Sequence, residues 1–193
     1  MKASELPLLS RPEVLFPGSM VTVCFSDPRE IGQLRSAHDG HLGFCLFHPA
    51  EGENPIRCMR VGTEAVIEDY TQTNTGGLRV KLRGGRRFRT QHTRSLHAGQ
   101  LVAQVDWLAE ESLTQVPLDY AVIVQLVARY MEKAQADYPR YRPQDCEDAS
   151  FVSFRLAELL PMETVEKQIL LELEDPLQRL KLLAVILPRF QAE

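Results

Sequence analysis

The chain is 193 residues long, carries a formal net charge of −4 at pH 7, and is 44% hydrophobic and 25% charged. This balance is typical of a globular protein with one medium domain or two small ones, and it excludes a disordered tail, a fibre or a coiled-coil rod. The acidic charge differs from the basic character of most nucleic-acid-binding domains. Apolar runs such as Leu182–Leu187 are far shorter than the about 20 residues of a membrane-spanning helix.

The N-terminus and the cysteines predict a cytoplasmic protein. The residues before Arg11 lack the continuous apolar core of a secretory signal. No two cysteines form a CxxC pair, and each lies in or beside apolar sequence, at Cys24, Cys45, Cys58 and Cys146. In a reducing compartment, such cysteines usually serve as small buried hydrophobic residues.

Up to about Trp107 the sequence predicts short strands separated by turns. The strands are predicted at residues 21–25, 42–47, 65–70, 78–83 and 101–107. Most of them alternate apolar and polar residues, which is the pattern of a sheet with one buried face. Residues 74–77, with two glycines, can close a hairpin because glycine readily adopts positive φ. Strands at such short intervals predict an antiparallel barrel or sandwich.

One helix is predicted to interrupt these strands, from Pro28 to about Ala37. Asp27 provides an N-cap acceptor and Pro28 suits the first helical position. Glu30 lies three residues after the cap, where it can complete a capping box. Residues 38–41 should then turn into the strand at 42–47.

After Ser112 the apolar spacing becomes that of helices. Six residues fall on one stripe of a helix that begins near Pro117, namely Ile123, Leu126, Val127, Tyr130, Met131 and Ala134. Further helices are predicted at 149–160, 164–173 and 176–187, the last of them capped by Asp175 and ended by Pro188. The sequence therefore predicts an α+β protein, with a β-rich barrel-like part at residues 1–112 and a helical bundle at residues 113–193.

The sequence contains none of the common motifs for nucleotide phosphates, dinucleotides, catalytic zinc or a nucleophilic serine. His38, His41, Cys45 and His48 are residue types that bind zinc, but their spacing matches no closed zinc motif. We therefore predict a protein that is not an enzyme and that has no cofactor and no metal site.

A basic strip at residues 79–94 is the strongest charge cluster, and it includes Arg83, Arg86 and Arg87. Gly84-Gly85 within the strip could let the backbone approach a phosphate closely, as on an RNA-binding edge. In the first part of the strip, Leu78, Val80 and Leu82 alternate with basic residues, and they are predicted to face the core. This alternation is typical of a half-buried strand whose basic residues form the solvated outer face, and the acidic net charge favours that interpretation.

Phe16 is the candidate for contact with an extended polypeptide. Pro17-Gly18 forces a turn directly after it, and this turn could leave the Phe16 ring near the surface. Core packing explains most other apolar side chains equally well.

Several segments, taken together in this order, resemble the N-terminal domain of the Lon protease. They are LPLL at 6–9, VLFPGSMVTVCFSDPRE at 14–30, VGTEAVIEDY at 61–70, LRVKLRGGRRFR at 78–89, LVAQVDWL at 101–108 and LAELLPMETVEKQILLELEDPLQRLKLL at 156–183. The resemblance covers nearly the whole chain. It departs from the family's commoner pattern at residues 24–30, where an aromatic residue often follows the arginine.

The resemblance implies a PUA-like antiparallel β-barrel followed by a C-terminal helical bundle. In the full-length protease this domain serves substrate recognition and subunit assembly, and ATPase and peptidase modules follow it. The chain is expected to be a stand-alone member without either module. Residues 16–18 match the family's turn after the first strand, and residues 85–88 match its glycine–arginine–aromatic turn.

The function expected from this resemblance is a non-catalytic module that binds unfolded or flexible polypeptide. The candidate binding residues are Phe16, Pro17, Arg83, Arg86, Arg87 and Phe88. The alternative is an RNA-binding protein that uses the basic strand edge, since PUA-like folds elsewhere bind RNA. No membrane partner is expected.

Overall fold

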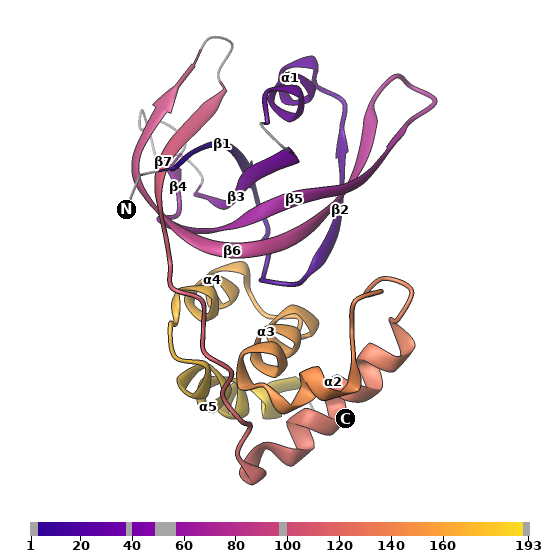
Figure 1. The fold of residues 1–193 in the computed structure, drawn as a ribbon, viewed down its shortest axis with the longest axis vertical. Coiled ribbons are helices and arrows are strands. Elements are labelled where there is room, and N and C mark those ends of the chain that lie inside the picture. The colour runs from indigo at the N-terminus through magenta and orange to yellow at the C-terminus, as the bar shows by residue number, and fades with distance from the viewer. Residues whose placement is uncertain (1–3, 38–39, 49–56, 97–99, 191–193) are drawn as a thin grey trace. The chain divides into compact units, whose positions relative to one another are not determined.

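The computed structural model describes residues 4–37, 40–48, 57–96 and 100–190. Its contacts divide the chain into two compact units, Met1–Ala109 (unit 1) and Glu110–Glu193 (unit 2). Strands dominate the described part of unit 1 and helices that of unit 2 (Figure 1), so the α+β class predicted from the sequence is confirmed. The predicted boundary at 112/113 stays a prediction, and Glu111 pairs with Arg179 of unit 2.

The strands of unit 1 form one hydrogen-bonded network (Figure 1). They are β1 (Ser4–Arg11), β2 (Met20–Phe25), β3 (His41–His48), β4 (Arg57–Cys58), β5 (Val61–Gln72), β6 (Leu78–Ser95) and β7 (Leu101–Trp107). The pairing runs β1–β7–β6–β5–β3, and β3 then pairs in parallel with β1, so the ring returns to its first strand. All five predicted strands are present, while β1 and β4 are additional.

The longest strand, β6, corrects one sequence-based expectation. It continues through residues 85–88, where the resemblance implies a turn. Opposite Glu64, the pairing with β5 shifts register, so that β6 accommodates one extra residue between Gly84 and Arg87. This feature is a β-bulge, which bends a strand without ending it.

The helix α1 (Pro28–Ser36) begins as its cap predicts, and the side chain of Asp27 accepts a hydrogen bond from the Arg29 N–H at 2.8 Å. Glu30 does not turn back to a capping box. It accepts instead from Arg11 Nη1 at 2.6 Å, because a cation from β1 lies within reach. Buried side chains from α1, the strands and the β1–β2 connection form the core of unit 1, which includes Leu9, Leu15, Val23, Phe25, Leu34, Leu42, Phe44, Ala65, Val80 and Leu82.

Unit 2 contains the four predicted helices, with ends within a few residues of those expected. They are α2 (Ala121–Lys133), α3 (Ala149–Leu159), α4 (Thr164–Glu172) and α5 (Pro176–Ile186). The helix α3 packs against the other three. Within the described residues, none of the helices is long and apolar enough to cross a membrane.

The apolar stripe predicted on α2 is wider than the face that packs. Ile123, Val127 and Met131 are buried, whereas Leu126 and Tyr130 are exposed. The three buried residues are spaced four apart and form one row that packs in the core of unit 2. The adjacent row, with Leu126 and Tyr130, is exposed to solvent.

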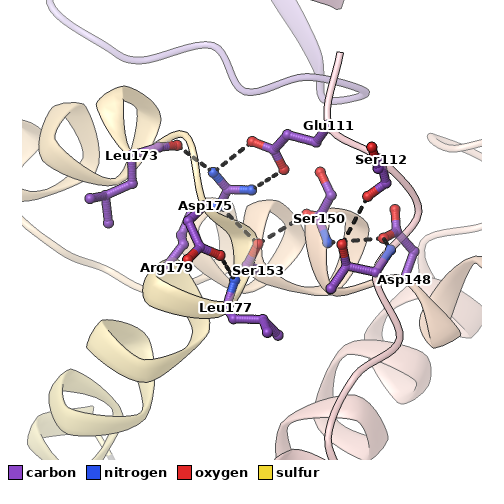
Figure 2. A network of polar contacts seen from close by, with 10 residues as sticks. Glu111, Ser112, Asp148, Ser150, Ser153, Leu173, Asp175, Leu177 and Arg179 are labelled. Carbon is purple, nitrogen blue, oxygen red and sulfur yellow. Dashed lines mark hydrogen bonds and ion pairs between the residues drawn. The ribbon is translucent and has the colours of Figure 1, made fainter. Parts of the chain in front are cut away.

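A buried arginine joins three segments of unit 2 (Figure 2). Arg179 of α5 donates from Nη1 and Nη2 to the carboxylate of Glu111, at 3.0 and 2.6 Å. It also donates to Ser153 Oγ and to the carbonyl oxygen of Leu173, each at 2.8 Å. Its guanidinium lies 3.6 Å from the centroid of the Phe154 ring. The buried charge is thus neutralised by a carboxylate and has several acceptors for its N–H groups.

Candidate functional site

The predicted turn at residues 16–18 is present, but the expected surface position of Phe16 is wrong. The Ser19 N–H donates to the carbonyl oxygen of Phe16 at 3.0 Å, and Gly18 has a φ of 75°. The Phe16 side chain is only 1% exposed, while Pro17 is half-buried. The physical reason is that the turn folds onto β6. There the Gly18 N–H donates to the Gly84 carbonyl and the Gly84 N–H donates to the Ser19 carbonyl, both at 2.9 Å.

The arginines of the basic strip point in different directions. Arg83 forms an ion pair with Glu68 at the surface. The guanidinium of Arg86 lies 4.2 Å from the centroid of the Trp107 ring, an arrangement that covers one face of the cation. Arg87, in contrast, is buried. These three arginines therefore do not form a single basic surface.

Phe88, the last of the predicted binding residues, is buried. Its ring packs edge-on against Trp107, with the two centroids 6.2 Å apart. It also belongs to a second core cluster with Leu6, Leu8, Cys45, Ala103 and Val105. Phe88 therefore stabilises the fold and presents no surface to a partner.

A carboxylate of the protein occupies the space beside Gly85. A Cβ at Gly85 would lie 2.4 Å from Glu64 Oε2, and that oxygen also accepts from the Arg86 N–H at 3.2 Å. The other oxygen of Glu64 lies 2.8 Å from His41 Nδ1. The close approach that the glycine pair permits is therefore used within the protein, and the negative charge there opposes a phosphate.

An open pocket lies between α1 and the β5–β6 hairpin of unit 1. Its volume is about 340 Å³, and it is lined by Leu34, Ile67, Tyr70, Leu78 and Val80. Leu34 and Val80 form the buried floor as members of the core, and Ile67 and Leu78 pack against that core. Tyr70, at 69% exposure, stands at the rim.

The chemistry of this pocket suits binding and offers no reacting group. The only polar atom among its five lining side chains is the hydroxyl of Tyr70. Its volume lies within the range of about 300–1,000 Å³ that is usual for ligand sites. In the part of the chain that the structure describes, no cluster of three or more His, Cys, Asp or Glu side chains could hold a metal ion. Of the histidines and cysteine weighed for zinc, His38 and the His48 side chain lie outside that part.

Sequence reasoning did not find this pocket. Leu78 and Val80 were predicted to face the core, and they do. The pocket depends, however, on where α1 packs against the hairpin, and no local pattern carries that information. The signal that the sequence does hold is Tyr70, a large aromatic residue at the end of a strand close to a turn.

The comparisons with known proteins agree with this architecture. The family model of the ATP-dependent protease La (LON) substrate-binding domain matches residues 5–189. The crystal structure of a Lon N-terminal domain protein from Xanthomonas campestris is similar with a TM-score of 0.77 and 29% identity, over 94% of this chain and 98% of that one. The N-terminal domain of a Mycobacterium avium complex Lon protease shares the fold with a TM-score of 0.65 and 19% identity, over 93% and 96% of the two chains.

A search of curated proteins found no match. The family match nevertheless spans both units and includes the segments around the pocket. The chain therefore belongs to the Lon substrate-binding domain family.

Proposed function

We propose that this protein is a non-catalytic module that binds unfolded or flexible polypeptide, and that the pocket of unit 1 receives an apolar side chain of the bound segment. The observation that carries the proposal is the open apolar pocket between α1 and the β5–β6 hairpin. The description of the family as substrate-binding supports it. The proposal includes a cytoplasmic location and a PUA-like barrel, which the closed ring of strand pairings supports.

The size of the pocket sets the strength of the interaction. Burial of one leucine or phenylalanine side chain contributes about 1.5–3 kcal/mol. This alone gives weak binding, so several contacts along a segment must add up to a micromolar affinity of about −8 kcal/mol. A pocket without charged lining residues does not select a particular sequence, which suits a module that takes many unfolded substrates.

The open edge of strand β5 beside the pocket contributes less to polypeptide binding than the pocket does. Beyond Val66, β5 pairs with β6 alone among the described strands, so one of its edges is open. At this edge the Tyr70 N–H donates to Asp69 Oδ1 at 2.8 Å. A charged side chain that occupies a backbone donor protects an edge from added strands. We therefore place the recognition in the pocket rather than in strand addition.

Substitution of Tyr70 by glutamate should weaken polypeptide binding about tenfold. The change removes the aromatic rim and places a negative charge beside an apolar pocket, which together should cost about 1.4 kcal/mol of binding free energy. The measurement is the fluorescence anisotropy of a labelled, permanently unfolded polypeptide titrated with the protein. Because Tyr70 is exposed, the variant should fold normally.

The matched control is Val165→Glu, which places the same charge at an apolar residue of α4 that is 66% exposed. Its affinity should equal that of the wild type. Equal affinities for wild type and Tyr70→Glu would show that the pocket is not the binding site. Equal losses in the two variants would show a nonspecific effect of charge.

Structured RNA added to the same titration tests the alternative. RNA binding falls steeply with salt because each neutralised phosphate releases counterions, whereas apolar binding changes little. We expect polypeptide binding to survive both added RNA and a several-fold increase in salt. The Arg86→Glu variant should bind the polypeptide as the wild type does. Capture of RNA with a steep salt dependence, together with no polypeptide binding, would contradict the proposal.

A further inference from the structure

Three side chains from three strands of unit 1 meet where β1, β3 and β4 adjoin. Ser10 and Cys45 are register partners in the parallel β1–β3 pair. Cys58 of β4 lies opposite Phe47, two residues along β3 from Cys45 and on the same face of the strand. Ser10 Oγ lies 2.9 Å from Cys58 Sγ, and the two cysteine side chains share a hydrogen bond.

The two thiols lie in unequal surroundings. Cys45 is completely buried in a core cluster, whereas Cys58 is half-buried and packs at the margin of that cluster. A small oxidant can therefore reach Cys58 from solvent, whereas Cys45 has no exposed surface. Both thiols are free in this structure.

The hydrogen bonds of the two thiols also favour Cys58 as the first to react. The bond from Cys45, aided by one from Ser10 and opposed by burial, lowers the pKa of Cys58 to about 7. The bond to Cys58 and burial raise the pKa of Cys45 well above its usual value. Cys45 thus keeps its proton, and Cys58 is the more readily deprotonated of the two, so Cys58 supplies the thiolate, which is the nucleophilic form.

We propose that Cys45 and Cys58 form a reversible dithiol–disulfide pair, in which a hydroperoxide oxidises Cys58 first and Cys45 resolves the product. A pair of thiols suits this chemistry better than metal binding, because no third ligand of the usual types joins them among the described residues.

The oxidation proceeds in two steps, in which Cys58 first reacts with the peroxide and Cys45 then forms the disulfide. The Cys58 thiolate attacks one oxygen of the peroxide, the O–O bond breaks, and the sulfenic acid of Cys58 forms as hydroxide or alkoxide leaves and takes a proton from water. The Cys45 sulfur then attacks the sulfenic sulfur, forming the S–S bond and breaking the S–O bond. The departing hydroxide leaves as water with the Cys45 proton. The sulfurs lose two electrons, the peroxide gains them, and a thiol reductant reverses the change.

The test treats the full chain with a small excess of hydrogen peroxide, alkylates the remaining thiols and maps the peptides by mass spectrometry. We expect a mass lower by two hydrogens, a linked pair of peptides that contain Cys45 and Cys58, and full recovery after reduction. Cys58→Ser should abolish the link. Cys45→Ser should leave a sulfenic acid on Cys58 that dimedone captures, and Ser10→Ala should slow formation of the link several-fold.

The matched control is Cys24→Ser, which removes an exposed thiol of β2 in the same unit. It should form the disulfide at the wild-type rate. Oxidation of Cys24 or Cys146 while Cys45 and Cys58 stay reduced would overturn the proposal, as would conversion of Cys58 to the sulfinic acid without a link. The wild-type peptide map decides between these results even where a variant fails to fold.

Discussion

The Arg179→Met variant should lose about 3–5 kcal/mol of the unfolding free energy of unit 2, the range expected when one member of a buried ion pair is removed. In the wild type the Arg179 side chain is fully buried, and that of Glu111 is only 9% exposed. The substitution therefore leaves the Glu111 carboxylate poorly solvated and without the cation that pairs with it. Ser153 and Leu173 also lose the donors that Arg179 provides (Figure 2). Methionine fills most of the same volume, so the loss reports on charge and hydrogen bonding.

The matched control is Arg142→Met. Arg142 also forms an ion pair with a carboxylate, Asp145, but its side chain is 68% exposed, and such surface pairs contribute about 0–1 kcal/mol. Urea unfolding followed by hydrogen exchange in α3 and α5 measures both variants. The addition of Glu111→Gln to Arg179→Met should restore part of the lost stability. An Arg179→Met protein as stable as the wild type would show that the network is not needed for the fold of unit 2.

The Gly84→Ala variant should lose about 2–4 kcal/mol of unfolding free energy in unit 1, at or above the upper part of the range for overpacked sites. A Cβ at Gly84 would lie 2.1 Å from the carbonyl oxygen of Phe16, which is backbone and has no rotamer to change. Relief of the clash requires the turn at residues 16–18 to move away from β6. This movement would break the two hydrogen bonds that join Gly84 to Gly18 and Ser19.

The control for this variant is Gly32→Ala in α1. There the nearest atom to the new Cβ is the side-chain nitrogen of Gln100 at 3.2 Å, which is the end of a flexible chain. Alanine is also favoured over glycine in a helix, by about 1 kcal/mol. We therefore expect Gly32→Ala to be neutral or slightly stabilising in thermal unfolding. Equal melting temperatures for Gly84→Ala and the wild type would contradict the close packing of the turn on β6.

Local sequence patterns predicted most of the secondary structure, because each element is specified by its own residues. Alternation identified β2 and β7, and the cap formed by Asp27 and Pro28 placed the start of α1 at the correct residue. The resemblance to the Lon family, which matches residues 5–189, implied a β-rich part followed by helices, and that order is present.

The predictions that failed depended on contacts between distant segments. The turn after Phe16 was predicted correctly, but its exposure depends on docking against Gly84 of β6. The candidate residues Arg83, Arg86 and Arg87 were grouped as parts of one basic strand edge. The bulge between Gly84 and Arg87 changes which side chains point outward, so Arg87 is buried and Arg86 is exposed.

The two sites proposed above also depend on tertiary placement. The pocket forms because α1 packs beside the hairpin, and the thiol pair forms because β4 returns to β3 opposite Phe47. In the sequence, Cys45 and Cys58 have the character of separate buried hydrophobic residues. Strand register is what gives them a shared chemistry.

The most direct test of polypeptide binding in the pocket is a methyl-resolved NMR titration of the protein with an unfolded polypeptide. We expect the largest shifts at methyl groups that line the pocket, those of Leu34, Ile67, Leu78 and Val80. Methyl groups buried in unit 2, such as those of Ile123 and Val127, should stay unchanged. Shifts confined to the exposed apolar residues of unit 2, Val165, Ile169 and Val185, or no shifts at saturation, would contradict the proposed site.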